Sequence, residues 1–419
     1  MERQNGRVVR VGFLLVVLAV AIGVLVWSIR ERAGVGREIV QHGTEQCELI
    51  AAPAGPEDIE IDHVLGFAFI SAHDRRARPS PNGDLHLLDL DDPDATIVAI
   101  PRDGPRRFKP HGLSLVRVDE VLYVHVVNHA GDEGSTVEQF RFEAGRLHHL
   151  ATVAGDALIS PNDVAAVDAR RFYVTNDHGT RSGLSQLFEN LLGLRFGTVA
   201  YFDGEKFVTA LEGQSMANGI ALTADQSRLL VAETIAGTVT SYRRDPETGE
   251  LSDAAYVPFQ TAPDNLDVAA DGSVWTVGHP RLFDFLAHAR NAEALSPTDV
   301  YRIDYASGVF GISADVERVL MDDGRLLSGG SVAVVRGDQM LVGNVFEPGI
   351  LRCTLPARFS VPLPAAPTEL EEASEPLEGV EPGGEEDEVG EPTEYDAADQ
   401  DPTGLDPRSS SERSLSPEA

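Results

Sequence analysis

Short apolar runs separated by turn residues follow one another from about residue 45 to residue 358. Runs such as 66–70, 121–127 and 229–232 are rich in β-branched and aromatic side chains, which is typical of strands. Pairs such as Asp203-Gly204 and Asp271-Gly272 lie between runs and indicate tight turns. The pattern predicts one all-β domain, because all-β rings of this length fold as single units.

The predicted strands belong to units that repeat. In each unit a polar or glycine pair precedes an apolar residue, a variable residue and another apolar or small one. The six copies start at Glu57, His111, Asn162, Asn218, Asp264 and Gly330. Their starts are about 50 residues apart, and a period of that length with several strands per unit is typical of a β-propeller. We therefore expect an all-β, six-bladed β-propeller over residues 45–358.

One segment has a helical period instead. Apolar residues at positions 184, 187, 188, 191 and 192 form a single stripe. Such a stripe most often packs on its own domain. A lid over a site, or a helix that faces a membrane, has the same pattern.

The chain begins with an uncharged run over residues 11–29, preceded by Arg3, Arg7 and Arg10. A helix of this length just crosses a hydrocarbon layer roughly 30 Å thick. A cleaved signal peptide is the alternative, but Trp27-Ser28-Ile29 is not a small-residue cleavage site. We expect a cytoplasmic leader over 1–10, a single-pass transmembrane signal anchor over 11–29 and a linker over 30–44. The catalytic domain would then lie on the extracytoplasmic side, periplasmic or extracellular.

The composition changes near the end of the chain, which is rich in Pro, Glu, Gly and Ser. Between Val361 and Ala419 acidic residues outnumber arginines 18 to 2, within a chain of net charge −33. Such a segment cannot bury enough apolar surface to fold, so we expect a disordered acidic tail over 359–419. The remaining domain is acidic as well, which argues against nucleic acid as a partner.

Cys47 and Cys353 are the only cysteines, and they lie just before the first repeat and just after the last. They could be two unrelated buried thiols. Their placement is also what ring closure requires, because the first and last strands of a propeller meet in one blade. We predict a disulfide between them, which needs an oxidising compartment and agrees with export past the anchor.

The first polar positions of the repeats should converge at one mouth of the central tunnel, because the inner strands of all blades line it. The oxygen donors at and beside these positions are Glu57, Asn162, Asn218, Asp264 and Asn265. A set made only of oxygens suits a hard cation with a large coordination number, and Ca²⁺ fits it better than Mg²⁺. The alternative is that these side chains are tunnel residues bridged by water.

Two further carboxylates stand one residue later in their repeats. Asp58 and Asp163 point elsewhere than the first set and could hold a second ion deeper in the tunnel. A main-chain carbonyl such as that of Leu113 would complete this second site.

Taken together, these segments resemble the paraoxonase (arylesterase) family of calcium-dependent six-bladed propeller hydrolases. The matching motifs include Pro161-Asn162-Asp163 and Thr175-Asn176-Asp177-His178. All matching segments occur in order: 55–61, 109–114, 126–129, 161–167, 172–178, 217–220, 264–266 and 277–280. The resemblance spans about residues 45 to 355, includes both cysteines, and has no counterpart for the acidic tail.

The resemblance implies two calcium ions. The catalytic ion would be bound by Glu57, Asn162, Asn218, Asp264 and Asn265. The structural ion would be bound by Asp58, Asp163 and the carbonyl of Leu113. The family's retained hydrophobic N-terminus is similar in kind to residues 11–29.

Histidines supply the candidate acid–base chemistry. By register, His111 lies at the metal mouth, and the resemblance pairs it with His129 as base and relay for an attacking water. Alternatively, His111 only forms a hydrogen bond to one of the metal ligands, and His129 is a structural residue at the end of a strand. His279 and His178 are weaker candidates, as pocket or support residues. No Gly-x-Ser-x-Gly element occurs, so nothing supports a serine nucleophile.

Three functions are compatible with the sequence. The first is a membrane-anchored, calcium-dependent hydrolase of lactones and aryl esters, with organophosphate esters as a side activity. The second is a propeller hydrolase of the gluconolactonase type. The third is a non-catalytic, calcium-stabilised binding propeller. The first two predict a small-molecule lactone or ester substrate, and the third predicts none.

Overall fold

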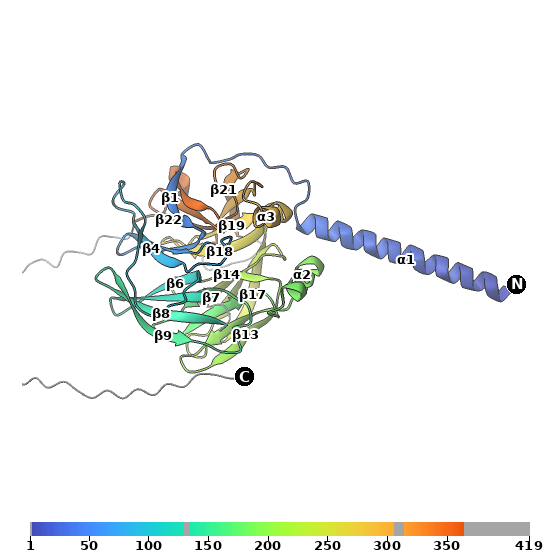
Figure 1. Ribbon diagram of the computed structural model, residues 1–419, viewed down its shortest axis with the longest axis horizontal. Helices are drawn as coiled ribbons and strands as arrows, with labels where there is room; N and C mark the ends of the chain where they lie inside the picture. Colours follow the sequence, from blue (N-terminus) through green and yellow to red (C-terminus); the bar gives the residue numbers. More distant parts are fainter. Residues whose placement is uncertain (1, 130–133, 306–313, 364–419) are drawn as a thin grey trace, which may run out of the picture. The chain divides into compact units, whose positions relative to one another are not determined.

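The structure is a computed structural model that describes residues 2–129, 134–305 and 314–363. These residues form six antiparallel sheets of four strands each. The six sheets follow one another around a ring, as the colours show from blue to orange (Figure 1). The predicted six-bladed β-propeller is confirmed.

Each blade uses four strands, and in five of the six blades the innermost strand comes first in the chain. The first three blades consist of β2 (Pro56–Asp62), β3 (Phe67–Ala72), β4 (Asp84–Asp89) and β5 (Val98–Ala99); β6 (Pro110–Val118), β7 (Val121–His129), β8 (Ser135–Glu143) and β9 (Arg146–Val153); and β10 (Pro161–Ala166), β11 (Phe172–Asn176), β12 (Gly197–Phe202) and β13 (Phe207–Gln214). The last three consist of β14 (Ala217–Leu222), β15 (Arg228–Glu233), β16 (Thr238–Arg244) and β17 (Leu251–Pro258); β18 (Ala262–Val268), β19 (Val274–His279), β20 (Thr298–Asp304) and β21 (Asp315–Asp322); and β22 (Gly330–Arg336), β23 (Gln339–Asn344), β24 (Pro348–Thr354) and β1 (Cys47–Ala54).

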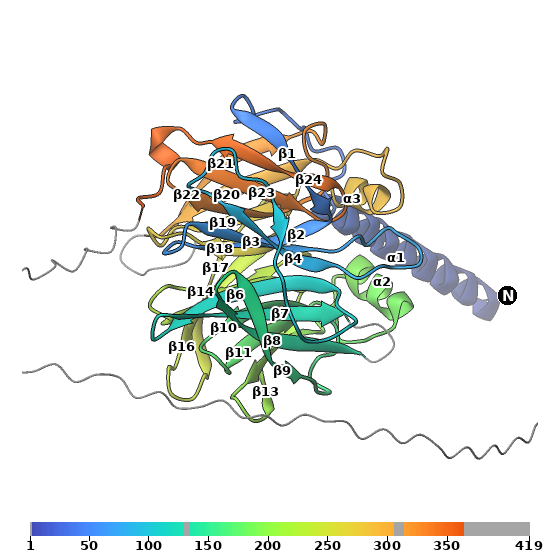
Figure 2. The same ribbon diagram turned by 60° about the vertical axis from the view of Figure 1, so that its left-hand side comes forward.

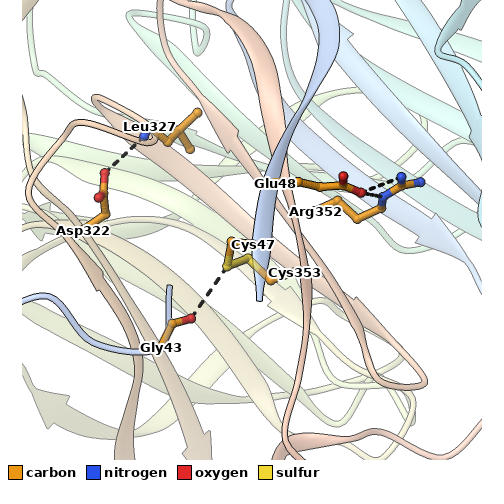
Figure 3. Close-up of a disulfide and its surroundings, with 7 residues drawn as sticks. All are labelled: Gly43, Cys47, Glu48, Asp322, Leu327, Arg352 and Cys353. Atoms are coloured by element: carbon orange, nitrogen blue, oxygen red, sulfur yellow. Dashed lines mark hydrogen bonds and ion pairs between the residues drawn. A yellow bond between two sulfur atoms is a disulfide. The ribbon is translucent and has the colours of Figure 1, made fainter. Parts of the chain in front are cut away.

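The last blade closes the ring, because its outer strand β1 comes from the beginning of the chain. The blue β1 lies beside the orange strands of this blade (Figure 2). Cys47 pairs with Cys353 across β1 and β24, and a disulfide joins them over a sequence separation of 306. An ion pair between Glu48 and Arg352, with 2.6 Å from Oε1 to Nη2, crosses the same two strands (Figure 3). The predicted disulfide is confirmed.

The hydrophobic core is divided among the gaps between blades. Each of six apolar clusters draws its residues from two neighbouring blades. The aromatic pair Phe108 and Phe140 packs between blades one and two, and Trp275 packs with Phe359 beside the closing blade. Because every blade contributes to two clusters, the ring is stabilised all the way around and its inner strands are held in place.

Each inner strand carries a β-bulge after its first one or two residues. In β10 the pairing runs from Pro161↔Asn176 to Val164↔Val174, so two residues, Asn162 and Asp163, oppose one. The same kind of register shift occurs in β2, β6, β14, β18 and β22. A bulge re-aims side chains that would otherwise point to opposite faces of the strand. The bulge explains how two consecutive polar residues of one strand can both be directed toward the tunnel.

Three α-helices are described in addition to the sheets. They are α1 (Glu2–Arg32), α2 (Gly183–Leu192) and α3 (Leu282–His288). The apolar part of α1, Gly12–Arg32, is long and apolar enough to cross a membrane. Helix α2 confirms the predicted helical segment. Its Leu184 and Phe188 are 68% and 53% exposed, so the interpretation that this stripe packs on its own domain does not hold.

The chain keeps its contacts a little beyond the last strand. A short 3₁₀ turn, η2, spans Ala357–Phe359, and both Phe359 and Val361 are buried. Most of the predicted disordered tail, from residue 364 onward, lies outside the described residues.

Candidate active site

A cavity of about 240 Å³ opens where the first residues of the inner strands meet. Its polar lining includes six of the predicted residues: Glu57, His111, Asn162, Asn218, Asp264 and His279. These side chains come from six strands, the inner strands of five blades and the second strand of one. The structure therefore brings together groups that the repeat register placed at one mouth of the tunnel.

The oxygen atoms of the predicted ligands are buried without hydrogen-bond partners. Within the described part of the chain, four atoms of this set share that property: Glu57 Oε2, Asn162 Oδ1, Asn218 Oδ1 and Asn265 Oδ1. Asp264, the fifth residue, accepts from His279 Nε2 through its Oδ2 at 3.0 Å. Buried polar atoms are rarely left unpaired, because each costs about 1–3 kcal/mol. Unpaired oxygens from several strands around one cavity fit a bound cation.

Neighbouring groups fix the direction of the amide oxygens. The amide nitrogen of Asn218 donates to Thr234 Oγ1 at 3.1 Å. That of Asn265 donates to Glu57 Oε1 at 3.0 Å and to the Glu57 carbonyl at 3.2 Å. The last two bonds link the first and fifth blades. Because both amide nitrogens donate hydrogen bonds to protein acceptors, the oxygen of each amide remains available to a ligand.

No group of three or more His, Cys, Asp or Glu side chains in residues 2–129, 134–305 and 314–363 is arranged to hold a metal ion. The donor set described above is compatible with this result, because three of its five members are Asn side chains. A mixed carboxylate and amide set is typical of Ca²⁺.

The charge state of Glu57 also suits a role as a ligand of a cation. Burial by itself would raise the pKa of Glu57, but the neighbouring His111 and Arg75 outweigh it and hold the pKa at about 2. The carboxylate is therefore ionised at neutral pH even before any cation binds.

Asp58 and Asp163 are close enough to interact electrostatically, and neither lines this cavity. Asp58 Oδ2 accepts from the N–H of Leu113 at 2.7 Å, and Asp163 Oδ2 accepts from the N–H of Ile220 at 2.9 Å. Each carboxylate thus reaches the neighbouring inner strand. A Cβ on Gly112 would come within 2.2 Å of Asp163 Oδ1, so only glycine fits there.

The carboxylates of Asp58 and Asp163 repel each other. Burial raises the pKa of Asp58 well above its ordinary value, and the charge of Glu57 adds to the effect. Burial, followed by the charge of Asp58, does the same to the pKa of Asp163. A divalent cation between them would reverse both shifts, because its charge stabilises the ionised carboxylates. Leu113 is adjacent, and the role of its carbonyl as a ligand stays a prediction.

The two candidate catalytic histidines are in direct contact. His111 Nδ1 lies 2.8 Å from His129 Nε2, and His129 Nδ1 lies 3.0 Å from Ser135 Oγ. His111 Nε2 is on the opposite side of its ring, 3.4 Å from Glu57 Oε2. Burial first, and the charge of His111 second, lower the pKa of His129 well below its usual value. A neutral His129 can accept the Nδ1–H of His111, which leaves His111 Nε2 as the acceptor facing the cavity.

The two weaker candidates have different positions. His279 lines the cavity and stacks on Phe285, with ring centroids 3.9 Å apart. His178 is not part of the cavity lining. It lies behind it, with Nδ1 2.7 Å from Asp177 Oδ1 and Nε2 3.1 Å from Asn190 Oδ1. Because Asn190 lines the cavity, His178 supports the wall formed by α2.

The sequence analysis missed the upper part of the cavity, which we call the rim. Its apolar members are Met216, Ile235, Leu282, Phe285, Leu286, Val345 and Phe346, and Arg75 joins them. They come from α3 and from loops between strands, outside the repeating motif. In both views α2 and α3 lie on the same side of the strands (Figures 1 and 2). A run of apolar residues just after His279 was the signal that could have indicated part of this wall.

Comparison with solved structures gives matches of low sequence identity. A luciferin-regenerating enzyme is 11% identical, with a TM-score of 0.46, and the match covers 74% of this chain and 94% of the other. A gluconolactonase from Xanthomonas campestris is 17% identical, with a TM-score of 0.40, and the match covers 77% and 99%.

Comparison with curated proteins gives closer relatives. Human serum paraoxonase/lactonase 3 is 31% identical over 339 residues, which cover 78% of this chain and 94% of the relative. Serum paraoxonase/arylesterase 2 of Gallus gallus is 32% identical over 334 residues, which cover 76% and 92%. The model of the arylesterase family matches residues 38–355, the whole ring with its terminal disulfide. The chain therefore belongs to the arylesterase family.

Proposed function

We propose that this protein hydrolyses lactones and aryl esters with the help of bound calcium. The observation that carries the proposal is the set of unpaired buried oxygens of Glu57, Asn162 and Asn218 around one cavity, together with that of Asn265, whose amide is bonded to Glu57. Family membership supports it, because the relatives named above are an arylesterase and a lactonase. Organophosphate esters are proposed as side substrates.

The oxygens of this set would hold the cation, which would supply polarisation of the substrate carbonyl and stabilisation of negative charge on its oxygen. Glu57 and Asp264 supply two negative charges that balance the ion, while Asn162, Asn218 and Asn265 supply neutral oxygens. Asp58, Asp163 and the Leu113 carbonyl would hold a second, structural ion below.

His111 is the proposed base. Its Nε2 takes a proton from a water molecule, whose oxygen forms a new bond to the carbonyl carbon. The carbon–oxygen bond of the ester or lactone then breaks, and the leaving oxygen receives the proton from His111. His129 holds His111 in the tautomer with Nε2 free, through the 2.8 Å contact between Nδ1 and Nε2. The rim excludes water and contacts the carbon chain of the substrate.

We also propose that α1 anchors the protein in a membrane as an uncleaved signal anchor. Its apolar part has a mean hydropathy of 2.7 and is not buried against the rest of the protein. The disulfide supports an oxidising compartment, hence a catalytic domain on the extracytoplasmic side. Protease added to cells from which any outer membrane or wall has been removed, with the plasma membrane intact, should release the domain. Protection of the domain in such cells would contradict this topology.

A lactone and ester panel tests the proposed activity. The full-length protein, in detergent and with its disulfide formed, is assayed with calcium, with a chelator, and with calcium restored. We expect hydrolysis only when calcium is present. A chelator-resistant hydrolysis would remove the metal from the proposal. Stable calcium binding without hydrolysis of any lactone or ester would favour the non-catalytic alternative, and turnover of sugar lactones alone would favour the gluconolactonase type.

A further inference from the structure

Arg75 is the one side chain of the rim that carries a positive charge among the residues lining the cavity. It lies in the loop between β3 and β4, and its side chain is only 16% exposed. Its Nη1 donates to three main-chain carbonyls, those of Gly55 at 3.2 Å, His73 at 3.3 Å and Val345 at 3.4 Å. These bonds fix the guanidinium group from one side.

The other side of the group has no such partner. Nη2 of Arg75 is buried and makes no hydrogen bond to any described residue. The oxygen that it faces, Glu57 Oε2, is 3.6 Å away, which is too far for a hydrogen bond. A buried, charged N–H without an acceptor is costly, so this nitrogen has the properties expected of a ligand contact.

The adjacent Arg76, in the same loop, has protein partners at both of its terminal nitrogens, although its Nε has none. Its Nη2 donates to the His288 carbonyl at 2.6 Å, its Nη1 pairs with Glu347, and its guanidinium stacks on Phe346 at 4.7 Å. Arg76 does not line the cavity. The two arginines are neighbours in sequence, yet only Arg75 offers a free N–H to the cavity.

The charge of Arg75 remains unbalanced once the proposed ions are in place. Glu57, Asp58, Asp163 and Asp264 carry four formal negative charges, which two divalent cations balance. Arg75 then adds one positive charge at the wall of a cavity whose rim is otherwise apolar. Arginine binds carboxylates in preference to most other groups, through paired N–H donors.

We propose that Arg75 is a specificity-determining residue that selects lactones and esters bearing an additional carboxylate. The carboxylate accepts from Arg75 Nη2, the scissile carbonyl lies at the oxygen set, and the rim contacts the carbon atoms between them. This inference rests on the proposed function and names the substrate class of the same site.

The test compares two lactones that differ in one group. γ-Valerolactone carries a methyl group where γ-carboxy-γ-butyrolactone carries a carboxylate, and the latter opens to 2-hydroxyglutarate. The wild-type protein should favour the carboxylated lactone in kcat/KM. Arg75→Leu should lower kcat/KM for that lactone by roughly ten- to hundredfold and leave that for γ-valerolactone within about threefold, because only the former loses a charge-assisted hydrogen bond. Arg75→Lys should retain part of the preference.

Arg78→Leu is the matched control, because it removes the same charge from the same loop at an exposed position. It should leave both rates unchanged. Equal losses for both lactones in Arg75→Leu would mean that Arg75 only balances Glu57, and no loss for either would mean that it does not contact the substrate. Either result overturns the inference.

A binding measurement separates this inference from the proposed function. Calorimetric titration of the calcium-loaded protein should show 2-hydroxyglutarate binding at least about tenfold more tightly than 4-hydroxyvalerate, with the difference lost in Arg75→Leu. If no lactone is hydrolysed, the proposed function fails while the titration still decides on Arg75. Equal binding of the two hydroxy acids by the wild-type protein would contradict the inference.

Discussion

The cavity has two parts of different origin, a polar floor and an apolar rim. The floor consists of residues on the inner strands β2, β6, β10, β14 and β18: Glu57, His111, Asn162, Asn218 and Asp264, which line the cavity, and Asn265, which donates to Glu57. The rim comes from α3 and from loops between strands. Floor residues occupy equivalent positions of a repeat and are held by neighbouring blades on both sides. Rim residues have no such constraint, so the floor can set the chemistry while the rim sets the substrate.

The largest expected effect concerns the floor. Glu57→Gln removes one of two charges around the proposed catalytic ion, so we expect kcat/KM to fall roughly 10²–10³-fold through lost stabilisation of the oxyanion. Steady-state turnover of a lactone by the variant and the wild type measures this loss of kcat/KM. The matched control is Glu60→Gln, which makes the same change three residues later in β2 and outside this cavity. Similar losses in both variants would show that the strand as a whole, and not the ligand, is responsible.

The second prediction concerns the strands behind the floor. His125 in β7 is fully buried, and burial lowers its pKa from 6.5 to about 4. Below pH 6.5 the unfolded chain takes up a proton at this residue while the folded protein does not, so stability is lost as the pH falls toward 4. The loss amounts to about 3 kcal/mol.

His125→Phe should remove this contribution. Denaturant unfolding at pH 7, 5 and 4 should show the stability of the variant relative to wild type rising by about 3 kcal/mol between pH 7 and 4. If the difference in unfolding free energy between variant and wild type does not change with pH, the pKa of His125 is the same in the folded and unfolded states.

The third prediction concerns the histidine pair. His111→Gln should lower kcat by roughly 10²-fold, the lower end of what a general base contributes. His129→Gln should cost less, about tenfold, because it removes only the group that orients His111. Steady-state kinetics with calcium in excess measures both. If His129→Gln costs more than His111→Gln, the assignment of base and relay is wrong.

The smallest effect is expected at the rim. Phe285 lines the cavity, whereas Phe283 in the same helix is 41% exposed and does not. Phe285→Ala should lower kcat/KM for a long-chain lactone about tenfold relative to a short-chain one, because apolar contacts with the chain are lost. Calcium affinity should not change. Phe283→Ala is the control, and a selectivity shift of equal size in that variant would contradict the separation of floor and rim.

The same comparison explains which parts of the site could be predicted from the sequence. Floor residues such as Asn162 and Asn218 occupy equivalent places in a repeat of about 50 residues, so register alone brings them together. The β-bulge that lets Asn162 and Asp163 both serve the tunnel has no distinct sequence signal. It lies near the start of each inner strand, where the pairing leaves the regular ladder.

The rim could not be predicted in this way. Arg75 and Arg76 look alike in the sequence, as two charges in a loop, and only the packing of Glu347 and Phe346 against Arg76 distinguishes them. In α3, Phe283 and Phe285 are equally apolar, and the position of the helix on the ring decides which one faces the cavity. Loops of different blades come into contact only once the ring is closed. The local sequence pattern therefore does not indicate these contacts.

Calcium titration of the metal-free, full-length protein, followed by assay of the same samples on a lactone, tests the central claim most directly. The account predicts two bound ions per chain, no hydrolysis before calcium is added, and recovery of turnover as the floor oxygens of Glu57, Asn162, Asn218, Asp264 and Asn265 become occupied. Full turnover by the metal-free protein, or a folded protein that binds no calcium, would contradict it.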